Sequence, residues 1–419
     1  MTDIRPWPKG VEQVARLEMT HTVLTFDGPG SVASALSDTL KPIASAKGLP
    51  NACYVDPAII GIERRQVFAG GWACAGFAHD TPGSGDLFPF EFADLPLLQV
   101  RDKTGEVQLF HNVCRHRGHI LVTEPTRSKR AIVCPYHGWS YDLSGQLKGT
   151  PHVGGMGQHT CPEFDVDNIR LKQVRSAEWF GLIFVDLSGE AEIFADYIRP
   201  ARERWQAFEN VDLVHTGTDC SIQFDLACNW KLAVENYCEA YHLPWVHPDL
   251  NRYSPLDAHE AIIEQSFSGQ QSANYTPEFP AGLPTFPDAP GLSSFWQSGA
   301  EYLSLFPNVL LGIHRDHFYA GIIQPQGPGR IIERFEIFYF DDAVRDPEFE
   351  ASRATNQALW KTIFAEDRDV VENMQKGRTS PGFDGGTFSP VMDAPTHAFH
   401  KWIATAMLHG RSSTKTAAE

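Results

Sequence analysis

The chain has 419 residues, of which 42% are hydrophobic and 21% are charged, and its 52 acidic residues outnumber its 35 basic ones. This composition is typical of a globular protein long enough for two domains, and the net charge of -17 disfavours binding to nucleic acid or to an anionic membrane surface. No stretch is long and apolar enough to span a membrane, and the first residues lack the apolar run of a signal peptide, which predicts a cytoplasmic protein.

The first 70 residues contain one apparent motif and one helical pattern. Gly28-Pro29-Gly30 imitates the turn of a dinucleotide site, but a proline lies inside it and no acidic residue follows a second strand, so we interpret it as a loop. Helical periodicity extends from Ile59 to Phe68 and ends at a pair of glycines.

Short strands are predicted where runs of period two alternate with turn residues. These runs cover residues 97–101, 107–112, 131–134 and 139–143. They predict a small antiparallel β-domain. A continuous apolar run from Trp179 to Leu187 predicts one more strand, which returns the chain to a larger domain.

Two cysteine–histidine pairs lie on successive loops of this β-domain. One residue separates Cys114 from His116, and two separate Cys134 from His137. Two thiolates on one iron and two imidazoles on the other are the ligands of a Rieske [2Fe–2S] centre. The two pairs therefore predict an iron–sulfur site.

A structural zinc ion is the alternative for the same four side chains, in a closed tetrahedral site. Zinc hairpins usually separate paired ligands by two or more residues, whereas the first pair here has one. Gly118 and Gly138 follow the two pairs, and glycine lets backbone N–H groups approach the sulfurs of a cluster. The spacing and the glycines favour the iron–sulfur interpretation.

The next elements lead to a second group of possible ligands. Residues 190–209 have a helical pattern, Ser221 to Leu226 reads as a strand, and Asn229 to Tyr241 reads as a helix. Glu239 and His242 lie three residues apart, so we expect them on one face of that helix.

Pro244 should end the helix just after His242 and allow His247 to return toward the same point. Two imidazoles and one distant carboxylate would form the facial triad of a mononuclear non-haem Fe(II), with coordination positions left open for dioxygen. The sequence therefore predicts a second metal site.

The rest of the chain is predicted as one long loop, three strands and two helices. Residues 249–300 are irregular and rich in Pro, Gly, Ser and aromatics, and a loop of this length usually serves as a lid or a binding wall. Strands are predicted at 301–312, 317–324 and 330–340, and helices at 347–376 and 395–407.

At these residues the chain resembles the catalytic α subunit of Rieske non-haem iron oxygenases, from about residue 50 to 409. The motifs that carry the resemblance are Cys114-X-His116-Arg-Gly118, Cys134-X-X-His137-Gly-Trp139, and Asn236-X-X-Glu239-X-X-His242 followed by His247. The resemblance implies an α+β fold with a Rieske domain at 51–185 and a catalytic domain at 186–419, to which residues 1–50 also belong. In the catalytic domain we expect an antiparallel sheet wrapped around a long helix, the helix-grip arrangement.

The resemblance also implies a third iron ligand on the late helix. Asp367 matches this position by its distance from Glu372 and Gln375, and Asp369 and Glu366 are the alternatives. Members of the family pass electrons from the cluster of one subunit to the iron of the next in a ring-shaped trimer, through an acidic residue. Glu239 matches that residue, and Asn236 is carried over with it as a site residue.

The implied partners and substrates follow from the same family. Electrons would come from NADH or NADPH through a separate reductase, because the chain has no credible flavin or nicotinamide site. Glutamate at position 239, in the frame Glu-X-Tyr-His, is similar to the subgroup that acts on quaternary ammonium compounds such as carnitine, glycine betaine and stachydrine. The run from Phe388 to His400 is similar to the choline and betaine branch. The implied reaction is oxidative N-demethylation.

A cationic head group would require aromatic ring faces. The aromatic candidates in the expected binding region are Tyr275, Phe279, Phe286, Phe295, Trp296, Tyr302, Phe306, Phe318 and Tyr319. Arg315 is the candidate for a carboxylate on the substrate.

Three other functions stay open at this point. The substrate could be an aromatic or heteroaromatic acid that is hydroxylated on its ring. The chain could be a Rieske electron carrier, although this leaves over 200 residues and the second ligand set unused. It could also be a zinc-stabilised binding protein without catalysis.

Overall fold

A computed structural model of the chain describes residues 32–128 and 130–411. The run Gly28-Pro29-Gly30 and the first 31 residues of the expected N-terminal segment lie outside the described residues. The described residues form two compact units. The larger unit comprises residues 32–68 and 192–411, and the smaller one comprises residues 69–128 and 130–191.

The division between the units differs from the expected one at residues 51–68. These residues form α2 (Ala52–Val55), α3 (Pro57–Glu63) and the π-helical turn η1 (Arg64–Phe68), and they belong to the larger unit. The reason is a buried contact with the larger unit, which the periodicity of the sequence does not reveal. Glu63 is fully buried and accepts hydrogen bonds from Trp230 Nε1 at 2.8 Å and from Lys231 Nζ at 2.5 Å.

The smaller unit contains three antiparallel sheets, with strand orders β1-β10-β9, β4-β3-β2-β5 and β6-β7-β8. The strands are β1 (Trp72–Phe77), β2 (Asp86–Phe92), β3 (Leu95–Arg101), β4 (Val107–His111), β5 (Thr126–Arg127), β6 (Ile132–Val133), β7 (Ser140–Tyr141), β8 (Leu147–Gly149), β9 (Arg175–Trp179) and β10 (Leu182–Asp186). The four strands expected between residues 97 and 143 are confirmed as β3, β4, β6 and β7. A small antiparallel β-domain is thus present.

The prediction of one strand from Trp179 to Leu187 is wrong. Phe180 and Gly181 have φ of +50° and +71°, so the chain reverses there and forms the hairpin of β9 and β10. Two consecutive residues with positive φ match the tight turns of hairpins. The apolar run conceals this turn because Phe180 is an unusual residue for such a position, and β10 pairs with β1 inside the smaller unit.

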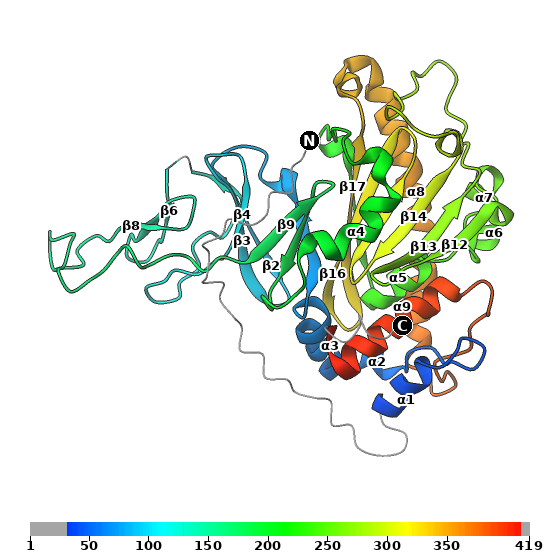
Figure 1. Cartoon of the computed structure of the whole chain (residues 1–419), viewed down its shortest axis with the longest axis horizontal. Coiled ribbons are helices and arrows are strands. Elements are labelled where there is room, and N and C mark those ends of the chain that lie inside the picture. Colours follow the sequence, from blue (N-terminus) through cyan, green and yellow to red (C-terminus); the bar gives the residue numbers. More distant parts are fainter. Residues whose placement is uncertain (1–31, 129, 412–419) are drawn as a thin grey trace. The chain divides into compact units, whose positions relative to one another are not determined.

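A seven-stranded antiparallel sheet forms the centre of the larger unit, in the order β11-β17-β16-β15-β14-β13-β12 (Figure 1). Its strands are β11 (Ser221–Leu226), β12 (His259–Ile263), β13 (Phe267–Ser272), β14 (Ala300–Leu305), β15 (Val309–Ile313), β16 (His317–Gly327) and β17 (Arg330–Tyr339). The α+β class is therefore confirmed.

Two corrections concern this sheet. The strand expected at 301–312 is the hairpin of β14 and β15, which turns at the cis peptide bond between Phe306 and Pro307. The loop expected from 249 to 300 contains α7 (Leu250–Tyr253) and the strands β12 and β13.

β13 escaped prediction because most of its buried side chains are polar. Ser268 donates to the carbonyl of Pro395 at 2.9 Å, and Gln270 donates to the carbonyl of Glu239 at 3.0 Å. Gly269 fits where a Cβ would lie 2.0 Å from the carbonyl oxygen of Tyr302. Each buried polar group has a partner, so the strand is stable without an apolar alternation.

Helices cover the sheet on both faces. Glu301 on β14 accepts from Arg204 and Trp205 at the end of α4 (Phe194–Arg204), while its neighbour Tyr302 lines a cavity beside α8 (Glu350–Gly377). Successive residues of a strand point to opposite faces, so α4 and α8 lie on opposite sides of the sheet (Figure 1). α5 (Trp230–Tyr237) contacts both the sheet and α8.

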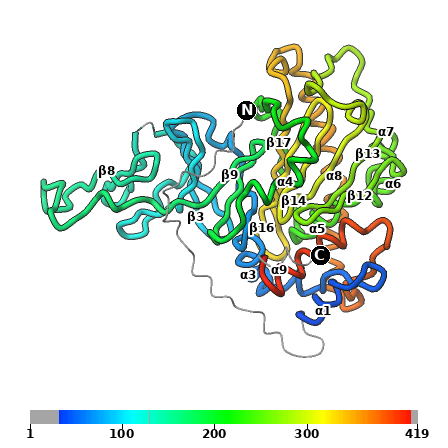
Figure 2. The backbone as a smooth tube through the Cα atoms, in the orientation of Figure 1, coloured from blue at the N-terminus to red at the C-terminus, as the bar shows by residue number. Residues whose placement is uncertain are grey.

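Segments far apart in the sequence lie side by side at one end of the larger unit (Figure 2). α9 (Ala394–His409) contacts α1 (Val32–Thr39) and η1. His400 Nδ1 accepts from the backbone of Leu49 at 3.2 Å, and His397 Nε2 lies 3.1 Å from the carbonyl of Thr39.

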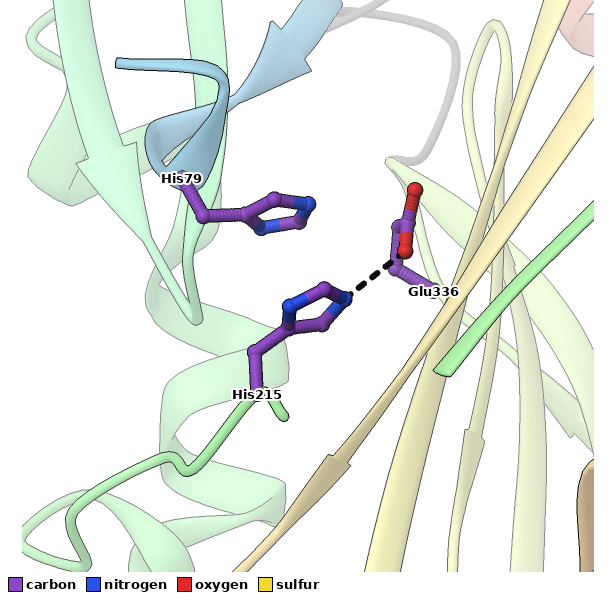
Figure 3. Close-up of side chains that lie close together, drawn as sticks. All are labelled: His79, His215 and Glu336. Atoms are coloured by element: carbon purple, nitrogen blue, oxygen red, sulfur yellow. Dashed lines mark hydrogen bonds and ion pairs between the residues drawn. The ribbon is translucent and has the colours of Figure 1, made fainter. Parts of the chain in front are cut away.

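One buried carboxylate on β17 accepts hydrogen bonds from three side chains of its own unit. Glu336 accepts from His215 Nε2 at 2.8 Å (Figure 3), from Ser221 Oγ at 2.6 Å and from Arg334 Nε at 2.6 Å. Buried charges are stable only when they are paired in this way.

Candidate functional site

The two loops that carry the cysteine–histidine pairs have the same backbone geometry. In each loop a glycine four residues after the cysteine donates to the cysteine carbonyl, at 3.1 Å from Gly118 and 3.0 Å from Gly138. The glycines have φ of +73° and +71°, a conformation that favours glycine. The loops are thus equivalent, although their histidines lie at different offsets from the cysteine.

These loops bring the four side chains together within the smaller unit. The rings of His116 and His137 lie 4.6 Å apart, and both Cys114 and Cys134 are buried. Burial raises the pKa of the Cys134 thiol, and the neighbouring thiol of Cys114 raises it further. Tyr141 Oη lies 3.3 Å from the sulfur of Cys114.

The arrangement suits a metal group that takes nitrogen and sulfur ligands. Within the described residues, the buried Nδ1 of His137 has no hydrogen-bond partner. A buried nitrogen is rarely left unpaired, and a metal ion would pair with it. His116 stacks on Trp139 at 4.5 Å, which fixes its ring.

The second group of ligands lies in the larger unit, but not on one helix as expected. α5 ends at Tyr237, so Glu239 and His242 do not share a helical face. Pro244 cannot donate to the carbonyl of Ala240, which disfavours a continuous helix. It lies instead in the first turn of α6 (Leu243–Val246), where proline is well tolerated.

A short loop therefore places the first two side chains of this group. The carboxylate of Glu239 accepts from the backbone N–H of Tyr241 and, at 3.3 Å, of His242. His247 follows α6 directly and donates its backbone N–H to Leu243 at 2.9 Å. The one-turn helix α6 thus sets the separation of the two histidines.

Ligand atoms of His242, His247 and Asp367 all lie within 4.8 Å of one another. Asp367 Oδ1 lies 3.8 Å from His242 Nε2 and 3.0 Å from His247 Nε2. Asn236 Nδ2 donates to the same oxygen at 3.0 Å and fixes the carboxylate. α5, the loop before α6 and α8 all contribute to the cluster.

Carboxylates determine which nitrogen of each histidine faces this cluster. Glu239 Oε1 lies 2.7 Å from His242 Nδ1, and Glu366 Oε2 lies 2.7 Å from His247 Nδ1. A carboxylate only accepts, so each Nδ1 donates, and the Nε2 of a neutral imidazole then has a lone pair for a metal.

The arrangement fits a cation. A neutral His247 would present its Nε2 lone pair to the oxygen of Asp367, so two acceptors would face each other. A metal ion bound between them would be a partner for both. Burial alone would lower the pKa of His247, but the hydrogen bonds and charges of Asp367 and Glu366 raise it overall.

The three acidic candidates on α8 have different positions. Asp367 faces the two histidines, and Glu366 bonds to the far nitrogen of His247. Asp369 is exposed. Two residues correspond to 200° of helical rotation, which places Asp369 on the side of α8 away from Asp367.

A cavity of about 50 Å³ adjoins His242, His247 and Asp367. Its lining includes ligand candidates, aromatic rings and polar side chains. The lining residues are Asn236, Tyr237, His242, Leu243, His247, Leu250, Ser254, His259, Gln270, Tyr302, Tyr319, Trp360, Ile363, Phe364 and Asp367.

The polar tips of the lining aromatic residues all have partners in the protein. Tyr237 Oη donates to the carbonyl of Leu311 at 2.8 Å and lies 2.9 Å from Tyr319 Oη. Tyr302 Oη lies 3.3 Å from His314 Nε2, and Trp360 Nε1 donates to His317 at 2.9 Å. The cavity therefore receives mainly ring carbon from these side chains.

Of the nine aromatic candidates, Tyr302 and Tyr319 line the cavity and the other seven do not. Arg315 does not line it either, and its guanidinium lies 3.1 Å from Asp288. His259 also lines the cavity but was not among the residues predicted from the sequence. Burial lowers the pKa of its imidazole.

A helical signal for the missed residues was present in the sequence. Trp360, Ile363, Phe364 and Asp367 follow the spacing i, i+3, i+4, i+7, which places them on one face of α8. Ser254 and Gln270 have no such signal, because they lie in residues 249–300, which the sequence pattern predicts as a loop.

None of the helices in residues 32–128 and 130–411 is long and apolar enough to cross a membrane.

Two protein families match separate parts of the chain. Residues 71–165 match the Rieske [2Fe-2S] domain, and residues 203–409 match the catalytic domain of the ring hydroxylating alpha subunit. The two matches fall on the parts that carry the two ligand clusters.

Curated relatives cover most of the chain at low identity. The choline monooxygenase of Arabidopsis thaliana is 26% identical over 86% of this chain and 82% of its own length. The glycine betaine monooxygenase oxygenase subunit of Chromohalobacter salexigens is 25% identical over 95% and 94%. The putrescine 2-hydroxylase of Ralstonia nicotianae is 29% identical over 89% and 99%.

Solved structures share the fold. A quaternary ammonium Rieske monooxygenase studied for carnitine oxidation superposes with a TM-score of 0.73 at 20% identity, over 89% of this chain and 98% of that one. Naphthalene 1,2-dioxygenase from Rhodococcus sp. bound to indole gives 0.68 at 20% identity, over 90% and 98%.

Proposed function

This chain belongs to the Rieske non-haem iron oxygenases, whose cofactors are a Rieske [2Fe–2S] cluster and a mononuclear iron, and from that premise we propose that it oxidatively N-demethylates a quaternary ammonium compound. The observation that carries the proposal is the cavity beside His242, His247 and Asp367, which offers aromatic rings whose polar tips are bonded elsewhere.

The cluster ligands are Cys114, His116, Cys134 and His137. The buried thiols and the unpaired nitrogen of His137 support this assignment within the described residues. The cluster stores and passes one electron at a time.

The iron ligands are His242, His247 and Asp367, supported by their mutual approach and by the two carboxylates that orient the imidazoles. When bound, iron supplies the activation of dioxygen. Asn236 holds the carboxylate of Asp367, and Glu366 holds the ring of His247. Glu239 orients His242 and carries the electron path toward that ligand.

The lining favours a quaternary ammonium head over other groups. A quaternary nitrogen has no N–H to donate and is attracted by ring faces, which Tyr302, Tyr319 and Trp360 can provide. Within the described residues the lining contains neither Lys nor Arg, so the carboxylate of an aromatic acid would be buried without a cationic side chain as its partner. A primary ammonium group would need several acceptors in place of rings.

The reaction balances with one dioxygen, two electrons and two protons. One oxygen atom enters a C–H bond of an N-methyl group, and the other leaves as water. The resulting carbinolamine breaks its C–N bond to give a tertiary amine, formaldehyde and a proton. NADH or NADPH supplies the two electrons through a separate reductase.

The assembly is proposed as a homotrimer, in which Glu239 couples the cluster of one subunit to the iron of the next. The relative from Chromohalobacter salexigens is named an oxygenase subunit, which supports a separate reductase partner.

The proposal is tested by turnover of the holoenzyme with a surrogate reductase. A panel of quaternary ammonium compounds and aromatic acids is supplied with NADH, and formaldehyde and oxygen uptake are measured together. We expect one formaldehyde per dioxygen with a quaternary ammonium compound. Hydroxylated ring products without formaldehyde would overturn the proposal.

A further inference from the structure

The cavity lining also contains a polar part that the proposed reaction does not use. It consists of Ser254, His259 and Gln270, called here the polar trio. We propose that the polar trio binds the tail of the quaternary ammonium substrate, and that this tail is an uncharged group bearing a hydroxyl rather than a carboxylate. The inference rests on the proposed function and narrows its substrate class.

Hydrogen bonds fix the orientation of the trio. Gln270 Nε2 donates to the carbonyl of Glu239 at 3.0 Å, so its Oε1 faces His259 Nδ1, at 2.6 Å. An amide oxygen only accepts, and His259 therefore carries a proton on Nδ1. His259 Nε2 lies 3.0 Å from Ser254 Oγ.

This orientation leaves both donors and acceptors for a ligand. Gln270 has a second N–H on Nε2, since an amide nitrogen carries two hydrogens. The hydroxyl of Ser254 can rotate between His259 and Ser272, whose Oγ lies 3.0 Å away. A hydroxyl group both donates and accepts, so it matches this set, whereas a carboxylate only accepts.

The charge of the lining also favours a hydroxyl over a carboxylate on the tail. The polar trio contains no Lys or Arg, and Asp367 is the acidic residue among those described that line the cavity. Ser254 is fully buried and Gln270 is 7% exposed. Burying a carboxylate beside such groups without a cationic side chain is unfavourable.

The trio has a fixed position relative to the iron ligands. His259 and Gln270 lie on the paired strands β12 and β13, and Gln270 bonds directly to the loop that carries Glu239 and His242. The tail would thus be held on rigid elements, while the head lies against Trp360 and Phe364 on the face of α8 that carries Asp367.

The test measures binding rather than turnover, by anaerobic calorimetry on the holoenzyme. Three ligands share the trimethylammonium head and differ in the tail: the cations tetramethylammonium and choline, and the zwitterion glycine betaine. The uncharged isostere 3,3-dimethylbutan-1-ol retains the hydroxyl and loses the charge. We expect choline to bind about tenfold more tightly than tetramethylammonium or glycine betaine.

Variants of the polar trio test whether these residues cause the preference for choline. Gln270→Leu and Ser254→Ala should each reduce choline binding to the level of tetramethylammonium and leave tetramethylammonium binding unchanged. Gln271→Leu is the matched control, because the next side chain of β13 bonds to Arg204 and Glu260 instead. Its choline binding should equal that of the wild-type protein.

The outcomes separate the inference from the proposed function. Glycine betaine binding as tightly as choline to the wild-type protein would overturn the inference and leave the proposed function intact. Equal binding of choline and its uncharged isostere would instead overturn the cation site on which the proposed function depends. The wild-type panel decides both questions even where a variant fails to fold.

Discussion

Glu366 Oε2 lies 2.7 Å from His247 Nδ1, and Glu366 directly precedes Asp367 in α8. Two consecutive residues of one helix therefore act on the same imidazole, one at each ring nitrogen. The carboxylate at Nδ1 fixes the tautomer and makes Nε2 a better ligand.

Glu366→Ala should weaken iron binding at the mononuclear site about 10- to 100-fold, because His247 loses the partner that orients it. Titration with a competing chelator measures this affinity without turnover. Asp369→Ala is the control, since it removes an exposed negative charge from the same helix. An equal loss in both variants would indicate a general charge effect and would contradict the orienting role of Glu366.

Glu239→Gln should slow the transfer of electrons from the cluster to the mononuclear site without emptying either centre. The carboxylate lies 2.7 Å from His242 Nδ1, and an amide at this position is neutral and can no longer accept with both atoms. Stopped-flow oxidation of the pre-reduced protein by dioxygen, followed in the cluster absorbance, measures the rate. An unchanged rate would remove Glu239 from the electron path.

Trp360→Leu should raise the KM for a quaternary ammonium substrate about tenfold, because a ring that can attract the cation is lost. Trp360→Phe retains a ring but leaves His317 Nε2 without its donor, so this variant should lose stability and largely keep its KM. Steady-state kinetics and thermal unfolding of both variants distinguish the two roles. A normal KM in Trp360→Leu would exclude contact between Trp360 and the substrate.

The stability of the iron-free protein should fall as pH rises from about 4.5 to about 8. Burial, together with the charge of Asp367, raises the pKa of Glu333 from 4.5 to about 8. Across this window the folded protein holds a proton that the unfolded chain has released, so rising pH favours unfolding by about 1.4 kcal/mol per unit.

Glu333→Gln should flatten this pH dependence, as measured by urea unfolding at several pH values. Glu260→Gln, on the exposed side of β12, is the control and should keep the wild-type slope. Identical slopes in the wild-type protein and in Glu333→Gln would show that Glu333 does not hold the proton.

Residue spacing predicted the features of the site that depend on residues close together in the sequence. The glycines after Cys114 and Cys134 reveal two equivalent turns, because only a left-handed conformation requires glycine there. The choice of Asp367 over Asp369 also agrees with the helical face that begins at Trp360.

Other features depend on partners distant in the sequence and could not be predicted. Gln270 is a buried residue of a strand only because Glu239 and His259 satisfy its amide. The end of α5 before Glu239 depends on Pro244 and on the backbone groups that the Glu239 carboxylate accepts from. A prediction from periodicity alone therefore extends this helix through Glu239 to Tyr241, although α5 ends at Tyr237.

Iron and acid-labile sulfide analysis of the wild-type protein and of the double variant His242→Ala His247→Ala tests the two separate metal centres most directly. We expect about three irons and two sulfides per chain in the wild-type protein. In the variant we expect about two irons and two sulfides with an unchanged red-brown cluster spectrum. Loss of sulfide in the variant, or zinc without sulfide in the wild-type protein, would contradict the presence of two separate iron centres.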